Sequence, residues 1–178
     1  MQKYNDKDVF ITPCELAKRQ IDMIDIVQGD AWYDPFRGTG VFFNQFPNTG
    51  KEHKWSEITD GRDFFEQEIK ADVICSNPPY TKLNDILRRI IILSPRVVSL
   101  LIGVGNLTAR RLEWMRDGGY NVTKLHMCKI WTCYGMSFIV QFEKNKPALL
   151  TFDRIVWKDQ NENNKYWDEN HRDKIQKK

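Results

Sequence analysis

The sequence predicts an α/β fold in which a mostly parallel β-sheet carries helices on both of its faces. Two observations indicate this class. Short β-rich runs alternate with segments of helical period, and unusual loops rich in glycine or proline follow two of those runs. The 178 residues are enough to bury a full core within one domain. Ligands of such sheets bind beyond the carboxyl ends of the strands, so these two loops are the first candidates for a site.

The first predicted element is an amphipathic helix over residues 12–27. Thr12 is a candidate N-cap, Pro13 takes the first helical position, and Glu15 completes a capping box. Apolar residues then recur along one helical face until Gly29 ends the segment.

The later elements are predicted from changes between strand and helix patterns. The run that begins at Leu83 has the apolar spacing of a helix, Pro95 closes it, and Gly118 ends the helix after that. The segment 60–68 has the pattern of a turn followed by a helical start. In chain order, the predicted strands are 31–33, 51–58, 71–75, 96–104, 122–131 and 136–143, with a last one at 149–157, and the predicted helices are 41–46, 83–91 and 106–116.

Composition indicates one catalytic domain over residues 1–150, followed by a polar tail over 151–178. The chain is 41% hydrophobic and 29% charged, which is typical of a soluble globular domain. No secretory signal pattern is present, and no apolar run reaches the ~18 residues of a membrane span. We therefore expect a cytoplasmic protein with no membrane partner and no separate target-recognition domain.

The four cysteines do not have the spacing of a metal site. They are far apart in the sequence, without a CxxC or Cys/His pattern, at Cys14, Cys75, Cys128 and Cys133. We expect reduced thiols in the core and no bound metal.

The loop after the strand at 71–75 is the most specific local signal. Its sequence is Ser76-Asn77-Pro78-Pro79-Tyr80, and two prolines cannot continue a strand ladder. A polyproline ligand is disfavoured because the motif directly follows a buried strand. The other loop, DPFRGTG at 34–40, is weaker evidence alone, because glycines are common in strand-to-helix turns.

Taken together, these motifs resemble those of the amino-methyltransferases that use S-adenosylmethionine, especially the N6-adenine DNA methyltransferases. The resemblance rests on five segments in the family's order: Phe10-Ile11-Thr12-Pro13, then Asp34-Pro35-Phe36-Arg37-Gly38-Thr39-Gly40, then Glu57, then Asp63-Phe64, then Asn77-Pro78-Pro79-Tyr80. It implies a Rossmann-like methyltransferase fold with a mostly parallel, seven-stranded sheet and helices on both faces.

The resemblance also implies S-adenosylmethionine as the cofactor. Backbone N–H groups of the glycine turn would face the carboxylate of its methionine part, and Glu57 would take both ribose hydroxyls. Asp63 would accept from the adenine amine, with Phe64 or Phe36 against the adenine ring. The implied cofactor-binding residues are Thr12, Pro13, Asp34, Pro35, Phe36, Gly38, Gly40, Glu57, Asp63, Phe64 and Asn77.

The catalytic residues implied by the resemblance are Asn77, Pro78, Pro79 and Tyr80. The Asn77 side-chain oxygen and the Pro78 carbonyl would accept from the NH2 group of the substrate and stabilise its developing charge. Tyr80 would stack on a base rotated out of the duplex. This chemistry needs neither a metal nor a strong base.

The implied activity is site-specific N6-adenine methylation of DNA. Methylation of RNA adenine or of a protein glutamine amide is an alternative, because the same tetrapeptide suits any planar conjugated amine. A non-catalytic subunit that binds nucleic acid is a third interpretation. Seven Lys or Arg residues against two acids over 81–116 favour nucleic acid, and we expect DNA or RNA as partner, with a second subunit or a homodimer left open.

Overall fold

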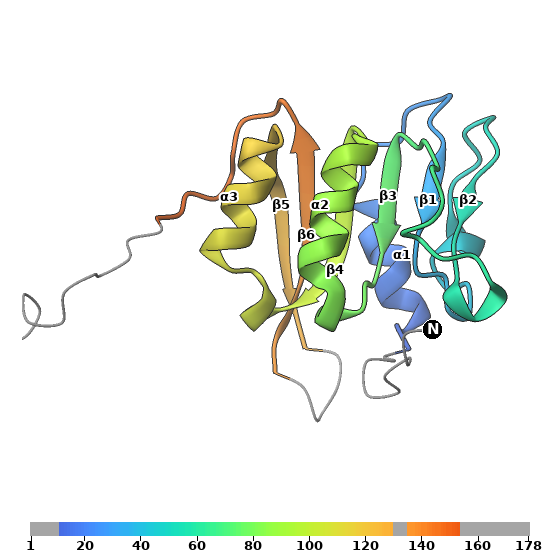
Figure 1. Cartoon of the computed structure of the whole chain (residues 1–178), viewed down its shortest axis with the longest axis horizontal. Helices are drawn as coiled ribbons and strands as arrows, with labels where there is room; N and C mark the ends of the chain where they lie inside the picture. The colour runs from blue at the N-terminus through green and yellow to red at the C-terminus, as the bar shows by residue number, and fades with distance from the viewer. Residues whose placement is uncertain (1–10, 130–134, 154–178) are drawn as a thin grey trace, which may run out of the picture.

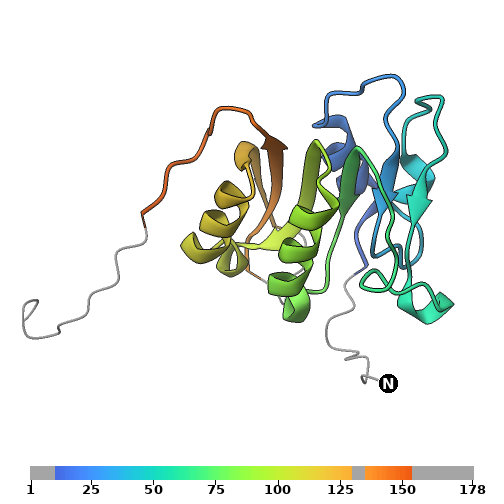
Figure 2. The ribbon, with the colours of Figure 1, turned by 45° about the horizontal axis from the view of Figure 1, so that its top comes forward.

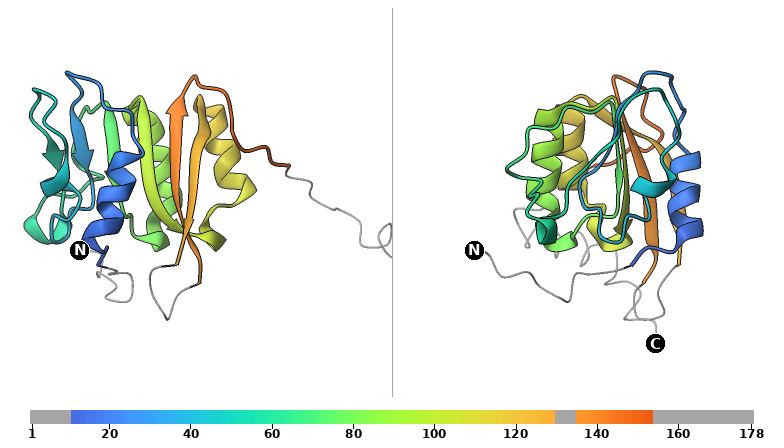
Figure 3. Two further views of the ribbon diagram at one scale, coloured as in Figure 1. Left: turned by 180° about the vertical axis from the view of Figure 1, so that it is seen from behind. Right: turned by 90° about the vertical axis from the view of Figure 1, so that its right-hand side faces the viewer.

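The computed structural model describes residues 11–129 and 135–153, and these form a six-stranded sheet covered by helices on both faces. The strand order is β2-β1-β3-β4-β6-β5. Strands β1 to β4 pair in parallel, whereas β6 pairs antiparallel with both β4 and β5. Helices α2 and α3 cover one face and α1 covers the other (Figures 1 and 3). The α/β class and the two-sided arrangement predicted from the sequence are confirmed.

The bounds of the elements follow the predicted alternation. The strands are β1 (Trp32–Asp34), β2 (Lys54–Trp55), β3 (Val73–Ser76), β4 (Val97–Gly103), β5 (Tyr120–Cys128) and β6 (Ser137–Lys144). The α-helices are α1 (Cys14–Asp22), α2 (Leu83–Leu93) and α3 (Ala109–Asp117), and short 3-10 helices are η2 (Phe43–Gln45), η3 (Ile58–Asp60), η4 (Tyr80–Lys82) and η5 (Val104–Asn106).

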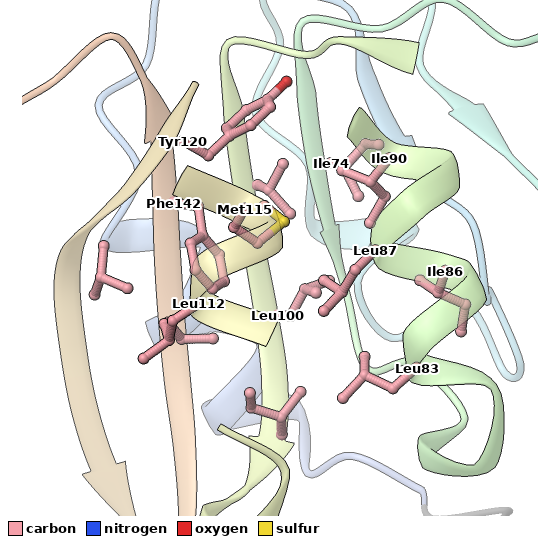
Figure 4. Packing of buried hydrophobic residues seen from close by; sticks show 14 of the residues in the cluster. Ile74, Leu83, Ile86, Leu87, Ile90, Leu100, Leu112, Met115, Tyr120 and Phe142 are labelled. Carbon is pink, nitrogen blue, oxygen red and sulfur yellow. The ribbon is translucent and has the colours of Figure 1, made fainter. Parts of the chain in front are cut away.

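The larger core lies between the sheet and helices α2 and α3, which lie side by side (Figure 2). Helix α2 buries its predicted apolar stripe, which includes Leu83, Leu87 and Ile90. Leu112 and Met115 of α3 fill the space beside it, so the two helices share one continuous apolar layer (Figure 4). This layer fixes the start of α2, and with it the loop that precedes the helix.

Helix α1 packs on the opposite face through Ala17 and Ile21. A buried amide strengthens this contact, because Gln20 Nε2 donates to the carbonyls of Ser76 at 3.2 Å and Ser99 at 2.9 Å. The helix is thereby tied to the carboxyl end of β3.

Three local predictions are wrong in detail. The N-terminal helix ends at Asp22 instead of reaching residue 27, and Thr12 does not cap it, because Pro13 is the N-cap residue and no side chain caps the helix. The run 41–46 forms only the single turn η2, since Pro47 and the turn residues after it leave too little chain for an α-helix.

The described residues contain six strands where the resemblance implied seven. Between β2 and β3 the chain forms η3 and irregular turns around Gly61, whose φ is +72°. The last predicted strand, 149–157, is not a strand over its described part, 149–153, and its remainder lies outside the described residues. Most of the predicted tail lies outside them as well.

The cysteines and the helix lengths bear on two further expectations. Cys14, Cys75 and Cys128 are free thiols, and Cys133 lies outside the described residues. Cys75 is buried and Cys128 half-buried, but Cys14 is exposed, so the expected core position is wrong for Cys14. In the described part of the chain, no helix is long and apolar enough to cross a membrane.

A partly buried ion pair fastens the end of the sheet opposite the two motif loops. Arg96 Nε donates to both carboxylate oxygens of Asp30, at 3.1 and 3.0 Å, and its Nη2 donates to the Asp25 carbonyl at 3.0 Å. We expect Arg96→Met to lower the free energy of unfolding by about 2 kcal/mol, because Asp30 would stay buried without its partner. Urea unfolding measures this, with Lys18→Met of the exposed Lys18–Asp22 pair as the control that changes little. Equal stabilities of the two variants would contradict the assignment.

Candidate functional site

The two motif loops lie at the same edge of the sheet. Parallel strands β1 to β4 all end at the lower edge in Figure 1. The DPFRGTG loop follows β1 and the NPPY segment follows the neighbouring strand β3. The sheet thus brings together segments about 40 residues apart, as expected for a doubly wound fold.

The glycine loop has the backbone that its sequence predicts. Gly38 has a φ of +50° and Gly40 a φ of +85°, which disfavour residues with a side chain. A Cβ on Gly40 would meet Asn44 Nδ2 at 3.0 Å, whereas a Cβ on Gly38 would meet no atom within 4 Å. Gly38 is exposed and Gly40 is buried. There is therefore room beside Gly38 for another group.

The loop is not followed by the expected α-helix. Only η2 follows, so a helix N-terminus and its dipole cannot supply the anion site that the resemblance implied. The N–H groups of Arg37, Gly38 and Gly40 already donate within the protein, so other groups of the loop would have to bind an anion.

Glu57 lies against this loop, just beyond the end of β2. Its Oε2 accepts from the Gly38 N–H at 2.7 Å, and its Oε1 accepts from the Thr59 N–H and hydroxyl. These three hydrogen bonds fix the carboxylate of Glu57, a residue that is 9% exposed, at the predicted position next to the glycine turn.

A hydrogen bond links the two motif loops beneath the surface. Ser76 Oγ donates to Asp34 Oδ1 at 2.6 Å, and both residues are fully buried. The Phe36 N–H donates to the same oxygen at 3.3 Å. Asp34 and the buried Pro35 therefore lie under the loop and hold its shape, and the link ends one residue before Asn77.

Burial raises the pKa of the Asp34 carboxyl to about 7, although the bonds from Ser76 and Phe36 act in the opposite direction and Glu57 adds a small increase. An unfolded carboxyl titrates near pH ~3.9. Between these pH values the native state binds more protons than the unfolded state, so the free energy of unfolding falls as pH rises through this window.

We expect Asp34→Asn to remove this pH dependence. Between pH 5 and 8 the wild type should lose about 2 to 3 kcal/mol relative to the variant, because only the wild type must ionise a buried carboxyl. Urea unfolding at both pH values measures the difference, with Asp22→Asn at an exposed site as the control. The same pH slope in wild type and Asp34→Asn would contradict the prediction.

The NPPY segment bridges β3 and α2. Asn77 Nδ2 donates to Thr12 Oγ1 at 3.2 Å, so the segment before α1, where Thr12 is 4% exposed and Pro13 is exposed, joins the site. Pro78 is buried and Pro79 half-buried. Tyr80 begins η4 and packs partly against the core under α2.

The predicted aromatic residues occupy different environments. Phe64 is only 2% exposed and packs against Phe36, with ring centroids 5.1 Å apart, and against Tyr33. Phe36 is half-buried and lies nearer the surface. Asp63 is half-buried, and its Oδ1 accepts from the Phe65 N–H at 2.9 Å.

Sequence reasoning missed one cluster beside the cofactor motifs. The Trp55 ring lies against two guanidinium groups, 4.4 Å from Arg37 Cζ and 4.0 Å from Arg62 Cζ. These contacts fasten the glycine loop and the segment after η3 to the short strand β2. Arg37, Trp55 and Arg62 are far apart in the sequence, so no local pattern showed that they meet.

Most arginines of the basic segment already have partners. Arg111 donates to Asn84 Oδ1 and to the Asn106 carbonyl and side chain, and Arg89 donates to the Gln67 carbonyl. Arg88 lies over the Trp114 ring at 4.5 Å. The cationic charge is therefore partly committed to packing.

A shallow hollow elsewhere on the surface does not include the predicted site. It runs along the outer side of α1 and is lined by Cys14, Lys18, Met23 and Gln45 among others. In the part of the chain that the structure describes, no group of three or more His, Cys, Asp or Glu residues could hold a metal.

The sequence matches no protein-family model and no curated protein at a significant level. Solved structures are similar in fold. The magnesium protoporphyrin IX methyltransferase ChlM from Synechocystis, which has bound S-adenosylmethionine, is 12% identical with a TM-score of 0.59 over 74% of this chain and 77% of its own. PH1948 from Pyrococcus horikoshii, described as an RNA methyltransferase, is 19% identical with a TM-score of 0.55 over 73% and 81%.

A third similar structure is the M protein of the type I restriction enzyme EcoKI. It is 14% identical with a TM-score of 0.56 over 76% of this chain, which spans 44% of the M protein. At these identities the comparisons show the fold alone. The chain has the Rossmann-like α/β fold of S-adenosylmethionine-dependent methyltransferases.

Proposed function

We propose that the protein is an S-adenosylmethionine-dependent methyltransferase that methylates the N6 amine of adenine in DNA. One observation carries the proposal: Asn77-Pro78-Pro79-Tyr80 lies at the carboxyl end of β3, beside the glycine loop of β1 and linked to it by the 2.6 Å bond from Ser76 to Asp34. A cofactor loop and an amine-binding loop in this order on adjacent strands is the arrangement that the motifs predict.

The residues at the cofactor side fit S-adenosylmethionine. The space beside Gly38 and the fixed carboxylate of Glu57 would accommodate the amino acid and ribose parts, and Asp63 would accept from the adenine amine. Thr12, Pro13 and Asn77 would border the site at the junction with the substrate. When bound, the cofactor supplies an electrophilic methyl group on a sulfonium centre.

The chain's own residues would activate the substrate by hydrogen bonding. The bond to Thr12 orients the Asn77 amide with its nitrogen toward the segment before α1, so its oxygen points away from that segment. This oxygen and the Pro78 carbonyl would accept from the exocyclic NH2 group, localise its lone pair and stabilise the charge that develops on nitrogen. Tyr80 would stack on the rotated base, and Pro79 would fix the turn between them.

DNA is favoured over the alternatives by the motif order and by the similarity to a restriction-enzyme M protein. The similarity to a protein described as an RNA methyltransferase keeps RNA adenine as the second candidate. A protein glutamine remains chemically compatible with NPPY. A non-catalytic subunit is disfavoured because Asn77 and both glycines of the loop are retained.

The experiment that tests the proposal is methyl transfer from labelled S-adenosylmethionine to DNA, RNA and total protein in parallel. The proposal predicts label in DNA above the other two acceptors. Label in protein alone, or none in any acceptor despite cofactor binding, would overturn it.

A further inference from the structure

Large exposed apolar side chains gather beside the NPPY segment along one stretch of the sheet edge. Val104 and Met136 are each 40% exposed and Met127 is 56% exposed. The Val104 N–H donates to the Met136 carbonyl at 2.9 Å, and Met127 pairs in register with Phe138, two residues from Met136. We call these three residues, Val104, Met136 and Met127, the edge row.

The sheet order places the edge row in line with the proposed catalytic loop. From β3, which ends before the NPPY segment, the next strands are β4, β6 and β5 (Figure 1). Val104 directly follows β4, Met136 directly precedes β6, and Met127 is the second-last residue of β5. At about 4.8 Å between strands, the row extends roughly 14 Å from the NPPY segment. A strand stacked at about 3.4 Å per nucleotide would pass about four nucleotides over this length, and an unstacked strand would pass fewer.

Three other exposed apolar residues lie far from this feature. Ile26, Ile92 and Leu149 lie at the opposite end of the sheet, before β1, before β4 and after β6. They provide matched positions with no relation to the site.

The charges around the edge row favour a nucleic acid as its occupant. Exposed cations lie at its two ends, with Arg110 at the start of α3 and Lys129 just after β5. Over the described segments 80–85, 104–111, 127–129 and 135–136, four cations stand against one acid, Asp85. An apolar row between cations suits bases held next to their phosphates.

We propose that the edge row contacts the bases that neighbour the target adenine and holds them unstacked while that adenine occupies the NPPY loop. The inference rests on the proposed function, because it takes the substrate to be a nucleic-acid strand. A base must leave its stack before methylation, and apolar side chains inserted between base steps promote this.

The residue types of the edge row predict how sequence-specific its contacts with DNA are. Valine and methionine offer no hydrogen bonds to base edges, and the thioether adapts to different shapes. The row would therefore give affinity with little sequence preference.

The test uses Met127→Ser/Met136→Ser, with Ile92→Ser as the matched control. Binding of a fluorescein-labelled, adenine-containing single-stranded DNA 12-mer is followed by anisotropy, and calorimetry follows binding of S-adenosylmethionine. We expect the double variant to raise the Kd for DNA about tenfold, with cofactor affinity and the thermal midpoint unchanged, and the control to stay within about twofold.

The outcomes separate the inference from the proposed function. A Kd for DNA within twofold of wild type in the double variant overturns the inference, even where methylation of DNA is observed. Loss of DNA binding in the double variant supports the edge row even if no methyl transfer to DNA is found. The absence of methyl transfer would contradict only the proposed activity. Methylation of a glutamine peptide whose KM rises in the double variant overturns the nucleic-acid occupant.

Discussion

Asn77→Ala is expected to reduce turnover by about 10² to 10³ while cofactor affinity changes far less. The side-chain oxygen is proposed to contact only the substrate amine, where it stabilises charge that appears in the transition state, and such acceptors contribute to the rate on this scale. Asn77 is half-buried and its variant removes no apolar side chain from the core, so the variant should fold. Single-turnover methyl transfer gives the rate, and calorimetry with S-adenosylmethionine gives the affinity.

The matched control is Asn121→Ala, which removes an amide that donates to the Lys146 carbonyl at the start of β5, far from the motif loops. It should retain wild-type turnover. Unchanged turnover in Asn77→Ala, or an equal loss in both variants, contradicts the proposed role of the amide.

Gly38→Val is expected to abolish binding of S-adenosylmethionine. The branched side chain would fill the open space beside the loop. Valine also disfavours the φ of +50° that the backbone adopts here, so the hydrogen bond from the residue-38 N–H to Glu57 would be disturbed. The loop would lose both its room for a ligand and its fixed carboxylate. Calorimetry at millimolar cofactor should show no heat.

The control for backbone strain is Gly50→Val. Gly50 also has a positive φ, +75°, and open space around it, but it lies before β2, away from the motif loops. This variant should bind the cofactor with wild-type affinity. Retained binding in Gly38→Val would show that the glycine loop does not form the cofactor site.

The elements predicted best were those whose pattern is set by burial. Helix α2 and strand β4 follow directly from their apolar patterns. The helix buries one face, which gives helical spacing, and the strand is buried on both faces, which gives a continuous apolar run. The two motif loops were placed correctly at strand ends, because proline and glycine interrupt strands through their own local backbone preferences.

The errors arose where tertiary contacts override local signals. Thr12 has the sequence context of an N-cap, yet its hydroxyl accepts from Asn77 in a distant loop. The segment 41–46 was predicted as a helix, but too few residues precede Pro47 for more than the single turn η2. The links from Gln20 to Ser76 and from Ser76 to Asp34 join residues far apart in sequence, so no local pattern could reveal them.

The most direct test of the account is nucleoside analysis of plasmid DNA after incubation with the purified chain and labelled S-adenosylmethionine. The account predicts that the label elutes with N6-methyldeoxyadenosine in the wild type and is absent from that fraction with Asn77→Ala. Label in 5-methyldeoxycytidine, or no label in DNA from an enzyme that binds the cofactor, would contradict it.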